Sequence, residues 1–256
     1  MKEKLLVLAK AAPAQSQKYE ELICVAGITD KGEWRRIYPV PWDIFWETSG
    51  RKFKKKMWIE YELESDAPSD HRPESRKIKF DTIKPLREAG YKEIEELIKG
   101  KITTIEELTA KTARVQSLGI VHPLEVKDFS PVSNAKYEKL TGRRKQMDLF
   151  GKPALKLEPP KFKYQYVFKD DTEGKFHEML CEDWEAAMLY HKCEEYRKKG
   201  KYKDEKEVHE KVKNKFLVDI FKRNHVYFIV GSHFRFPSFM IVGVLYPKKA
   251  DELLES

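Results

Sequence analysis

The stretch "ELICVAGITDKGEWRRIYPVP", residues 21–41, decides the fold class because it contains two apolar segments and a turn between them. Glu21–Ile28 and Trp34–Tyr38 are rich in β-branched and aromatic residues, which is typical of strands. The intervening Thr29–Glu33, "TDKGE", predicts a hairpin turn. The two prolines that follow are predicted to end the second strand, because proline has no N–H to donate to a ladder. This hairpin predicts an antiparallel sheet.

Three further segments extend the predicted sheet. Lys4–Lys10 is an apolar run that is too short for a signal-peptide core, so it is predicted to be the first strand. Lys56–Glu64, "KMWIEYELE", alternates apolar and polar residues, and Lys77–Phe80 is another short strand. Five short strands, the earlier ones joined by turns, favour a small antiparallel barrel or a curled sheet.

The rest of the chain is predicted to combine helices with two more hairpins. Five segments are predicted to be helical: Tyr91–Lys99, Thr104–Gln116, Lys136–Lys145, Glu182–Lys199 and Lys206–Arg223. Thr104 and Glu107 form a capping box, since the hydroxyl and the carboxylate can each satisfy an amide of the first turn. One hairpin is predicted between Tyr164–Lys169 and Lys175–Leu180, and the other within the apolar segment 225–246.

These elements predict an α+β fold with an N-terminal antiparallel β-barrel-like unit, a helical middle, and a C-terminal unit of β-hairpins and helices. The segment 151–160, "GKPALKLEPP", contains three prolines and little periodicity. It is therefore predicted to link a unit at 1–150 to a unit at 161–256. One integrated domain is the alternative, because a long connection can cross a shared surface.

The charge balance favours an anionic partner. Of the 256 residues, 41% are hydrophobic, which excludes wholesale disorder. The formal net charge is +8, which attracts nucleic acid, anionic lipid or acidic proteins. No run approaches the roughly 20 apolar residues of a membrane span, so no membrane partner is expected. Three cysteines without framework spacing favour a reducing cytoplasm. Abundant Lys and Glu with sparse Asn and Gln are typical of growth at high temperature.

The first candidate contact surface is the predicted strand Trp34–Tyr38. Alternation places Trp34, Arg36 and Tyr38 on one face of the strand, and Arg35 on the other. Aromatic rings stack on bases with roughly 1–3 kcal/mol each, and a guanidinium between them can contact phosphate. The alternative is that both rings belong to the core while Arg36 reaches solvent at the sheet edge.

Two basic clusters are predicted to contact phosphates. The segment 51–56, "RKFKKK", surrounds one phenylalanine with five cations: Arg51, Lys52, Lys54, Lys55 and Lys56. Such cations repel one another unless an anion lies opposite, and each phosphate they neutralise would release a counterion. Arg143 and Arg144 form a second cluster at a predicted helix C-terminus. The alternatives are a solvated loop for the first cluster and complementation of the helix dipole for the second.

The last candidate is the connection "GSHFRFPS", residues 231–238, between the two C-terminal strands. It carries two phenylalanines where a turn normally has Gly, Asn or Asp. In an extended conformation, His233 and Arg235 share one face while Phe234 and Phe236 share the other. The segment therefore suits a base or phosphate pocket, and the alternative is a hydrophobic cap over the C-terminal sheet.

Metal and catalytic sites have weaker support in the sequence. Four side chains are of zinc-ligand type: His177, Cys181, His191 and Cys193. Their spacing is poor, so no metal ligands are assigned. A metal-dependent nuclease needs carboxylates that converge on Mg²⁺, and the segments 70–74 and 177–185 supply acids and histidines for one. Phosphate-loop, dinucleotide, nucleophile-elbow and HExxH motifs are absent.

The sequence therefore predicts a cytoplasmic nucleic-acid-binding protein that favours single-stranded or unpaired DNA or RNA and needs no cofactor. The first alternative is a metal-dependent nuclease or another nucleic-acid-modifying enzyme, for which Mg²⁺ would be required. The second alternative is a protein-interaction module whose basic loops recognise an acidic partner.

Overall fold

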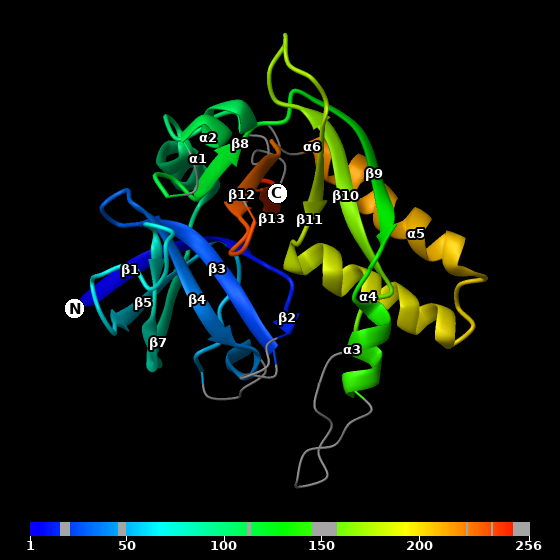
Figure 1. Cartoon of the computed structure of the whole chain (residues 1–256), viewed down its shortest axis with the longest axis horizontal. Helices are drawn as coiled ribbons and strands as arrows, with labels where there is room; N and C mark the ends of the chain where they lie inside the picture. Colours follow the sequence, from blue (N-terminus) through cyan, green and yellow to red (C-terminus); the bar gives the residue numbers. More distant parts are fainter. Residues whose placement is uncertain are drawn as a thin grey trace, which may run out of the picture.

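The computed structural model describes residues 1–15, 21–45, 50–111, 114–144, 158–223, 225–236 and 238–247. Two sheets form the framework, with helices around them (Figure 1). The mixed α+β class predicted from the sequence is confirmed. No helix among the described residues has the length and apolar composition needed to cross a membrane.

The first sheet is curled into a half-barrel and is built from the first 88 residues. Its strands are β1 (Lys2–Lys10), β2 (Ala14–Gln15), β3 (Glu21–Thr29), β4 (Trp34–Pro41), β5 (Met57–Leu63), β6 (Ser75–Arg76) and β7 (Ile78–Glu88). They follow the order β6-β4-β3-β1-β5-β7, and β2 pairs with β3. The predicted β3–β4 hairpin is confirmed, since these strands pair antiparallel across the turn.

The end predicted for β4 was wrong, because the strand continues through both prolines to Pro41. On its outer side β4 pairs with β6 at only Arg36 and Ile37. Beyond these residues β4 is therefore an edge strand on that side. An edge position tolerates proline because the missing N–H faces no partner strand.

The second sheet combines the C-terminal strands with two strands from the middle of the chain. Its members are β8 (Leu118–Val121), β9 (Glu125–Ser133), β10 (Phe162–Lys169), β11 (His177–Cys181), β12 (Tyr227–Ser232) and β13 (Phe239–Leu245). The order is β8-β12-β13-β11-β10-β9. Both predicted hairpins, β10–β11 and β12–β13, are confirmed. The helical middle needs a correction, because β8 and β9 lie there and were not predicted.

Helices are α1 (Tyr91–Ile98), α2 (Ile105–Lys111), α3 (Tyr137–Arg144), α4 (Trp184–Lys198), α5 (Glu205–Lys213) and α6 (Ile220–Arg223), with a π-helical turn (Asn214–Asp219) joining the last two. The predicted capping box is confirmed. The Thr104 hydroxyl accepts from the Glu107 amide at 3.2 Å, and the Glu107 carboxylate accepts from the Thr104 amide at 3.3 Å. Helices α4 and α5 lie beside the second sheet (Figure 1).

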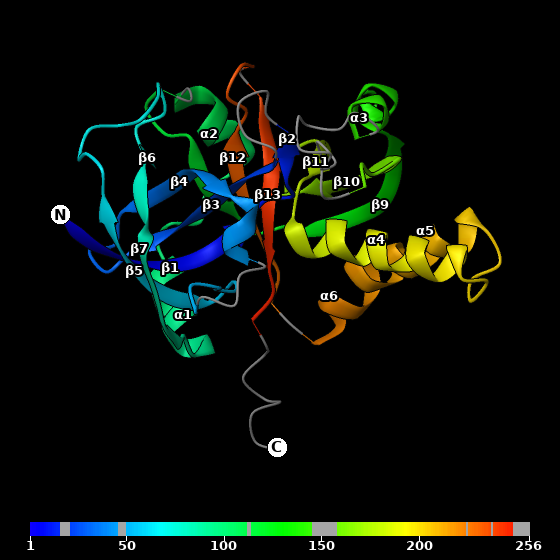
Figure 2. The same cartoon turned by 90° about the horizontal axis from the view of Figure 1, so that it is seen from below.

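The two sheets share a hydrophobic core where β1 crosses β13 (Figure 2). Successive side chains of β1 point to opposite faces, so Leu5 enters the half-barrel core while Leu6 enters the core between the sheets. A Cβ on Gly243 would lie 2.5 Å from Cβ of Ala9, so this close approach requires glycine. The predicted linker at 151–160 lies mostly outside the described residues, and the division into units at 1–150 and 161–256 stays a prediction.

Candidate functional site

A buried polar network joins segments that are far apart in the sequence. Arg36 on β4 is 2% exposed. Its guanidinium donates to the Ser117 carbonyl at 2.8 Å, to the Ser117 hydroxyl at 3.1 Å and to the Ser232 carbonyl at 3.4 Å. The Glu74 carboxylate accepts from the amide and the hydroxyl of Ser117. These bonds hold β4, the loop 70–74, the start of β8 and the end of β12 in one place.

Arg72 connects this network to the surface. Its Nε and Nη2 donate to the two carboxylate oxygens of Asp70 at 3.0 and 2.6 Å. Burial raises the pKa of Asp70, but the hydrogen bonds from Arg72 outweigh burial and lower that pKa overall. The guanidinium carbon lies 5.9 Å from the ring centre of Tyr38 and 5.3 Å from that of Phe234. A planar cation therefore lies near two aromatic rings at the base of the β12–β13 turn.

The turn between β12 and β13 presents aromatic side chains to solvent. Phe234 is 50% exposed and Phe236 is 63% exposed. The ring of His71, from the loop 70–74, lies 5.3 Å from that of Phe234, and His233 stacks on Phe236 at 4.8 Å. Arg235, between the two phenylalanines, is also exposed. We call this set the aromatic tip: Tyr38, His71, Arg72 and residues 233–236.

His233 determines the conformation of the aromatic tip. Its Nδ1 accepts from the amides of Arg235 at 3.0 Å and Phe236 at 3.3 Å. The extended conformation considered from the sequence is therefore wrong, because these bonds close a tight turn. Burial, and then the charges of three neighbouring cations, lower the pKa of this imidazole: Lys136, Arg72 and Arg235. Arg235 is exposed and adds a positive charge to the aromatic tip, whereas the charge of Arg72 is paired with Asp70. Figure 2 shows the β12–β13 turn on the same side of the molecule as α3.

Of the three residues predicted to share a contact surface on β4, which are Trp34, Arg36 and Tyr38, only Tyr38 belongs to the aromatic tip. Trp34 is half-buried and packs against the core between the sheets. Arg35 pairs with Glu3 at 2.9 Å and with Glu33 at 2.6 Å. The guanidinium of Arg36 is enclosed by the network, so it positions backbone segments and does not face solvent.

Lys55, predicted to contact phosphate, lies in the interior. Its Nζ lies 2.9 Å from Asp183 and 2.9 Å from Glu185, and it donates to the Val244 carbonyl at 2.9 Å. Burial lowers the pKa of Lys55, but the two carboxylates outweigh burial and raise that pKa overall. Asp183 also caps α4 by accepting from the amides of Glu185 and Ala186. Lys55 therefore joins the half-barrel to the second sheet.

Other cations of the segment 51–56 lie beside a pocket of about 380 Å³. Lys52 and Lys54 are exposed at its edge, and Phe45 and Trp184 are in its wall. Inside it, Nζ of Lys10 lies 3.9 Å from the ring centre of Phe45 and 4.2 Å from that of Trp184. Burial, and then the charge of Lys55, lower the pKa of Lys10 to about 7.

Four predicted contact residues lie elsewhere. Arg51 and Lys56 are partly exposed, and Nζ of Lys56 lies 5.3 Å from the ring centre of Tyr91. Arg143 and Arg144 end α3, and their side chains lie outside the described part of the structure. Among the side chains that the structure describes, the cations of the segment 51–56 therefore do not form one patch with the aromatic tip, whereas Arg235 belongs to it.

The acids considered for a nuclease have separate partners. Asp70 pairs with Arg72, and Glu74 binds Ser117. In the second segment, Glu182 pairs with Lys163 and Asp183 with Lys55. The loop 70–74 does not bring its own carboxylates together, whereas in the segment 177–185 Asp183 and Glu185 both lie 2.9 Å from Nζ of Lys55, which occupies the point where they meet.

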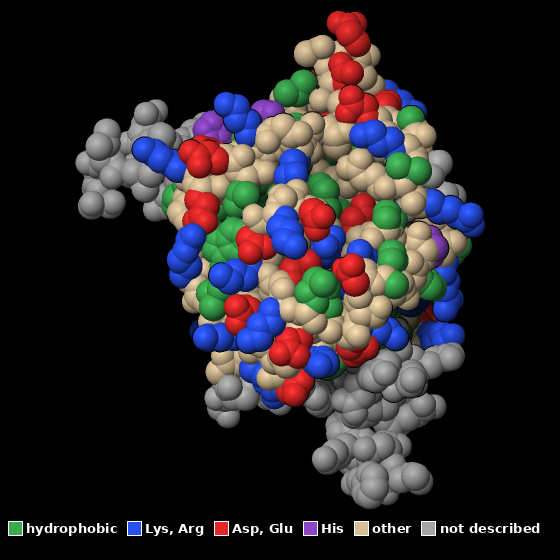
Figure 3. Space-filling model, turned by 90° about the vertical axis from the view of Figure 1, so that its left-hand side faces the viewer, with side chains coloured by type: hydrophobic (Ala, Val, Ile, Leu, Met, Phe, Trp, Pro, Cys, Tyr) green, Lys and Arg blue, Asp and Glu red, His purple; other side chains and the backbone are tan. Residues whose placement is uncertain are grey.

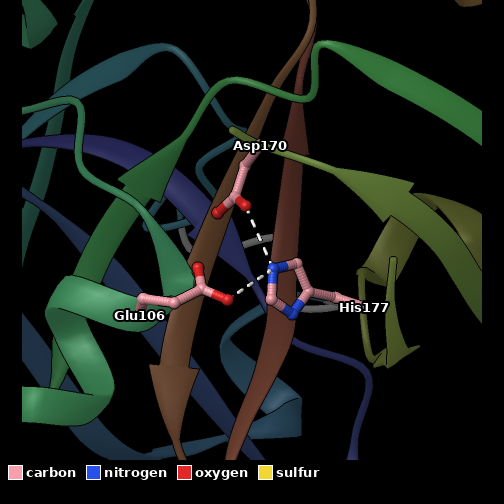
Figure 4. Close-up of side chains that lie close together, drawn as sticks. All are labelled: Glu106, Asp170 and His177. Atoms are coloured by element: carbon pink, nitrogen blue, oxygen red, sulfur yellow. Dashed lines mark hydrogen bonds and ion pairs between the residues drawn. The ribbon is translucent and has the colours of Figure 1, made fainter. Parts of the chain in front are cut away.

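His177 has partners that the sequence analysis missed. Its Nε2 lies 3.0 Å from Asp170 and 3.3 Å from Glu106 (Figure 4). The two cysteines considered as ligand types and not assigned to a metal site, Cys181 and Cys193, are free thiols in the interior, and burial raises their pKa values. Neither belongs to the cluster around His177. The short spacing between Asp170 and His177 across a predicted hairpin turn is the sequence signal that could have identified this pair.

Two family models match the chain. The model described as Domain of unknown function (DUF8758) matches residues 1–101, and the model described as Domain of unknown function (DUF8757) matches residues 101–255. The chain belongs to the DUF8757 family. No curated protein matches the chain. The DUF8758 match ends in the loop between α1 and α2, so it covers the half-barrel, and the DUF8757 match covers the second sheet.

Both matched segments contribute to the aromatic tip. The DUF8758 segment supplies Tyr38, His71 and Arg72, whereas the DUF8757 segment supplies the turn at 233–236. The Arg36 network crosses the same boundary through Ser117 and Ser232. The aromatic tip therefore exists only when the two segments pack together.

Proposed function

We propose that the chain binds single-stranded or unpaired nucleic acid through the aromatic tip. The observation that carries this proposal is the exposure of Phe234 and Phe236, at 50% and 63%, beside Arg235. Apolar rings held in water cost free energy that folding does not recover, so grouped exposed aromatics favour a binding role. Bases stack on such rings with about 1–3 kcal/mol each, with little dependence on sequence.

The charge and geometry of the aromatic tip support a polyanionic strand as the ligand. Arg235 is an exposed cation of the aromatic tip, and the guanidinium of Arg72 lies 5.3 Å from the ring centre of Phe234 while it pairs with Asp70. Two aromatic pairs, His71 with Phe234 and His233 with Phe236, offer separate rings on which unpaired bases can stack. Bases in a duplex are enclosed by their neighbours, so unpaired segments fit this surface better.

The half-barrel side of the molecule supports a local contact and not a broad basic face. In Figure 3 the half-barrel side of the molecule carries basic and acidic side chains interspersed. The net charge of +8 is therefore not gathered on that face. A surface that makes few phosphate contacts is expected to bind with an affinity that depends only weakly on salt. Each contact with a single strand adds about 0.7 to the slope of the logarithm of the affinity against the logarithm of the salt concentration. Free thiols at Cys24, Cys181 and Cys193 support a reducing cytoplasm as the setting.

Fluorescence anisotropy with labelled single-stranded DNA and RNA, and with a matched duplex, tests the proposal. We expect the single strands to bind more tightly than the duplex. Replacing both rings, Phe234→Ala with Phe236→Ala, removes two stacking surfaces and is expected to weaken binding at least about 30-fold, the equivalent of roughly 2 kcal/mol or more. Matched control variants truncate leucines that are also exposed, Leu124→Ala and Leu180→Ala, and are expected to bind like the wild type.

Three outcomes would contradict the proposal. One is the absence of binding at low salt, and another is equal affinity of the aromatic double variant and the leucine controls. The third is tighter binding of the duplex. Capture of an acidic protein by the nuclease-treated chain, lost in the double variant, would assign the aromatic tip to a protein partner instead.

A further inference from the structure

We propose that Glu106, Asp170 and His177 form a binding site for a divalent transition metal, with Zn²⁺ as the ion that fits best. Each residue offers one ligand atom, and the three atoms all lie within 4.8 Å of one another. Figure 4 shows the imidazole of His177 with Nε2 facing both carboxylates, one from α2 and one from the end of β10. This site lies within the DUF8757 segment and is independent of the nucleic-acid contact proposed above.

The distances suit direct coordination. Nε2 lies 3.0 Å from Oδ1 of Asp170 and 3.3 Å from Oε1 of Glu106. Zinc binds nitrogen and carboxylate oxygen at about 2.0–2.2 Å with tetrahedral geometry, which places ligand atoms roughly 3.4 Å apart. Both separations from Nε2 are within about 0.4 Å of this value. The two carboxylate oxygens, which lie within 4.8 Å of each other, would approach one another when an ion replaces the proton on Nε2.

The inner ligands are held in position before any ion binds. Oδ2 of Asp170 accepts from the Ile105 amide at 2.7 Å, which fixes the carboxylate and leaves Oδ1 toward the imidazole. Asp170 and His177 are each 8% exposed, and the His177 ring packs 5.6 Å from that of Phe168. Hydrogen bonds of this kind, from groups that do not touch the ion, orient metal ligands and tune the affinity of the site for the metal.

The outer ligand provides access from solvent. The side chain of Glu106 is half exposed, in the first turn of α2, whereas its neighbour Glu107 turns back to complete the capping box. Three protein ligands leave one position for water, as in sites where zinc acts on a bound molecule. The ion would also join α2 to the β10–β11 hairpin.

Charge and ligand type select the ion. Two carboxylates meet at one imidazole, and a dication neutralises both of them without a proton on His177. An imidazole nitrogen favours Zn²⁺ over Mg²⁺ or Ca²⁺, which prefer oxygen ligands alone. The order expected for this site is Zn²⁺ above Mn²⁺, with Mg²⁺ weakest.

Calorimetric titration of chelator-stripped full-length chain with Zn²⁺, Mn²⁺ and Mg²⁺, each as the metal alone, tests the proposal. We expect one Zn²⁺ per chain, bound more tightly than the other two ions, and a higher unfolding temperature with zinc. Glu106→Gln changes an exposed side chain without disturbing the fold, and is expected to weaken zinc binding at least tenfold. His177→Ala is expected to abolish it.

His225→Ala is the matched control, because His225 is an exposed histidine outside the cluster of Glu106, Asp170 and His177. The control is expected to leave zinc binding unchanged. Zinc retained by both Glu106→Gln and His177→Ala, or lost in His225→Ala, would overturn the proposal. No zinc binding by the wild type would also overturn it and identify the cluster as a buried ion pair. If His177→Ala does not fold, the visible absorption of bound Co²⁺, compared between wild type and Glu106→Gln, decides the question.

Discussion

Lys55 and Lys10 line the same pocket, and both are buried, yet burial has opposite outcomes for them. Nζ of Lys55 lies 2.9 Å from Asp183, and its pKa is raised. Nζ of Lys10 lies between the rings of Phe45 and Trp184, and its pKa is lowered to about 7. Burial penalises both ammonium groups, but only a carboxylate attracts the charge strongly enough to reverse the penalty.

This difference separates cations that hold the fold from cations that remain available. Lys55 is enclosed by its ion pair and joins the two sheets, whereas Lys10 lies at a pocket and can lose its proton near neutral pH. Arg36 is an intermediate case, because its hydrogen bonds go to neutral carbonyls and a hydroxyl. The three buried cations therefore predict three different sensitivities to mutation.

The largest effect is expected for Asp183→Ala. The substitution removes the more deeply buried of the two carboxylates from Lys55, and with it the acceptor for the Val244 amide and the first turn of α4. Breaking a buried ion pair from one side costs about 3–5 kcal/mol in the free energy of unfolding. Urea unfolding measures this loss of stability. Asp183→Asn combined with Lys55→Met is the control, and it is expected to recover more than half of the loss. A loss below about 1 kcal/mol for Asp183→Ala would refute the structural role given to this pair.

Arg36→Met is expected to have the next largest effect. It leaves the carbonyls of Ser117 and Ser232 without their guanidinium donor, at a cost of about 2–3 kcal/mol in the free energy of unfolding. Because the same bonds hold the aromatic tip, affinity for single strands is expected to fall as well. The comparison variant is Arg87→Met, whose exposed pair with Glu93 is screened by solvent and contributes little to the free energy of unfolding. Equal stability losses in the two variants would show that the network adds nothing beyond a surface ion pair.

The smallest effect is expected for Lys10→Met, and it depends on pH. The folded state holds the pKa of Lys10 at about 7, while the unfolded chain keeps the ordinary value of 10.5. Between these values the unfolded state binds more protons, so the stability that Lys10 contributes rises as pH increases. Between pH 7 and pH 9 the free energy of unfolding of the wild type is expected to rise by about 1–2 kcal/mol relative to that of Lys10→Met. Cation–π contacts stabilise the ammonium group and so offset part of the pKa shift.

Urea unfolding at several pH values checks this difference, with Lys206→Met as the control on a highly exposed lysine. If the free energies of unfolding of the wild type and Lys10→Met changed with pH in parallel, burial would not lower the pKa of Lys10. The Lys206→Met curve is expected to follow the wild type throughout.

Local patterns in the sequence were sufficient for much of the fold. The β3–β4 hairpin, the Thr104–Glu107 capping box and the helices α4 and α5 all follow from neighbouring residues. The strands β8 and β9 were missed for a physical reason. β8 has four residues, too few to show a period, and β9 carries mixed polar residues because it forms the edge of its sheet.

The candidate sites were less predictable than the elements that carry them. The phenylalanines in the turn after β12 were recognisable, because two large apolar residues are unusual in a short connection. Their neighbours His71 and Arg72 come from a loop about 160 residues earlier in the sequence. The hydrogen bond from Arg72 to the Ser232 carbonyl and the contact between the rings of His71 and Phe234 bring the two segments together. Glu106, likewise, resembles an ordinary acid in the first turn of a helix.

The sequence by itself determined the antiparallel hairpins, the helix starts and the excess of positive charge. These properties depend on backbone preferences and side chains within a few residues of one another. Only the tertiary structure decided that Lys55 and Arg36 are enclosed, that Lys10 lies in a pocket, and that Phe234 remains in water. The reason is that the free energy of a charge or a ring depends on its burial and its partner, and most of these partners come from distant parts of the chain.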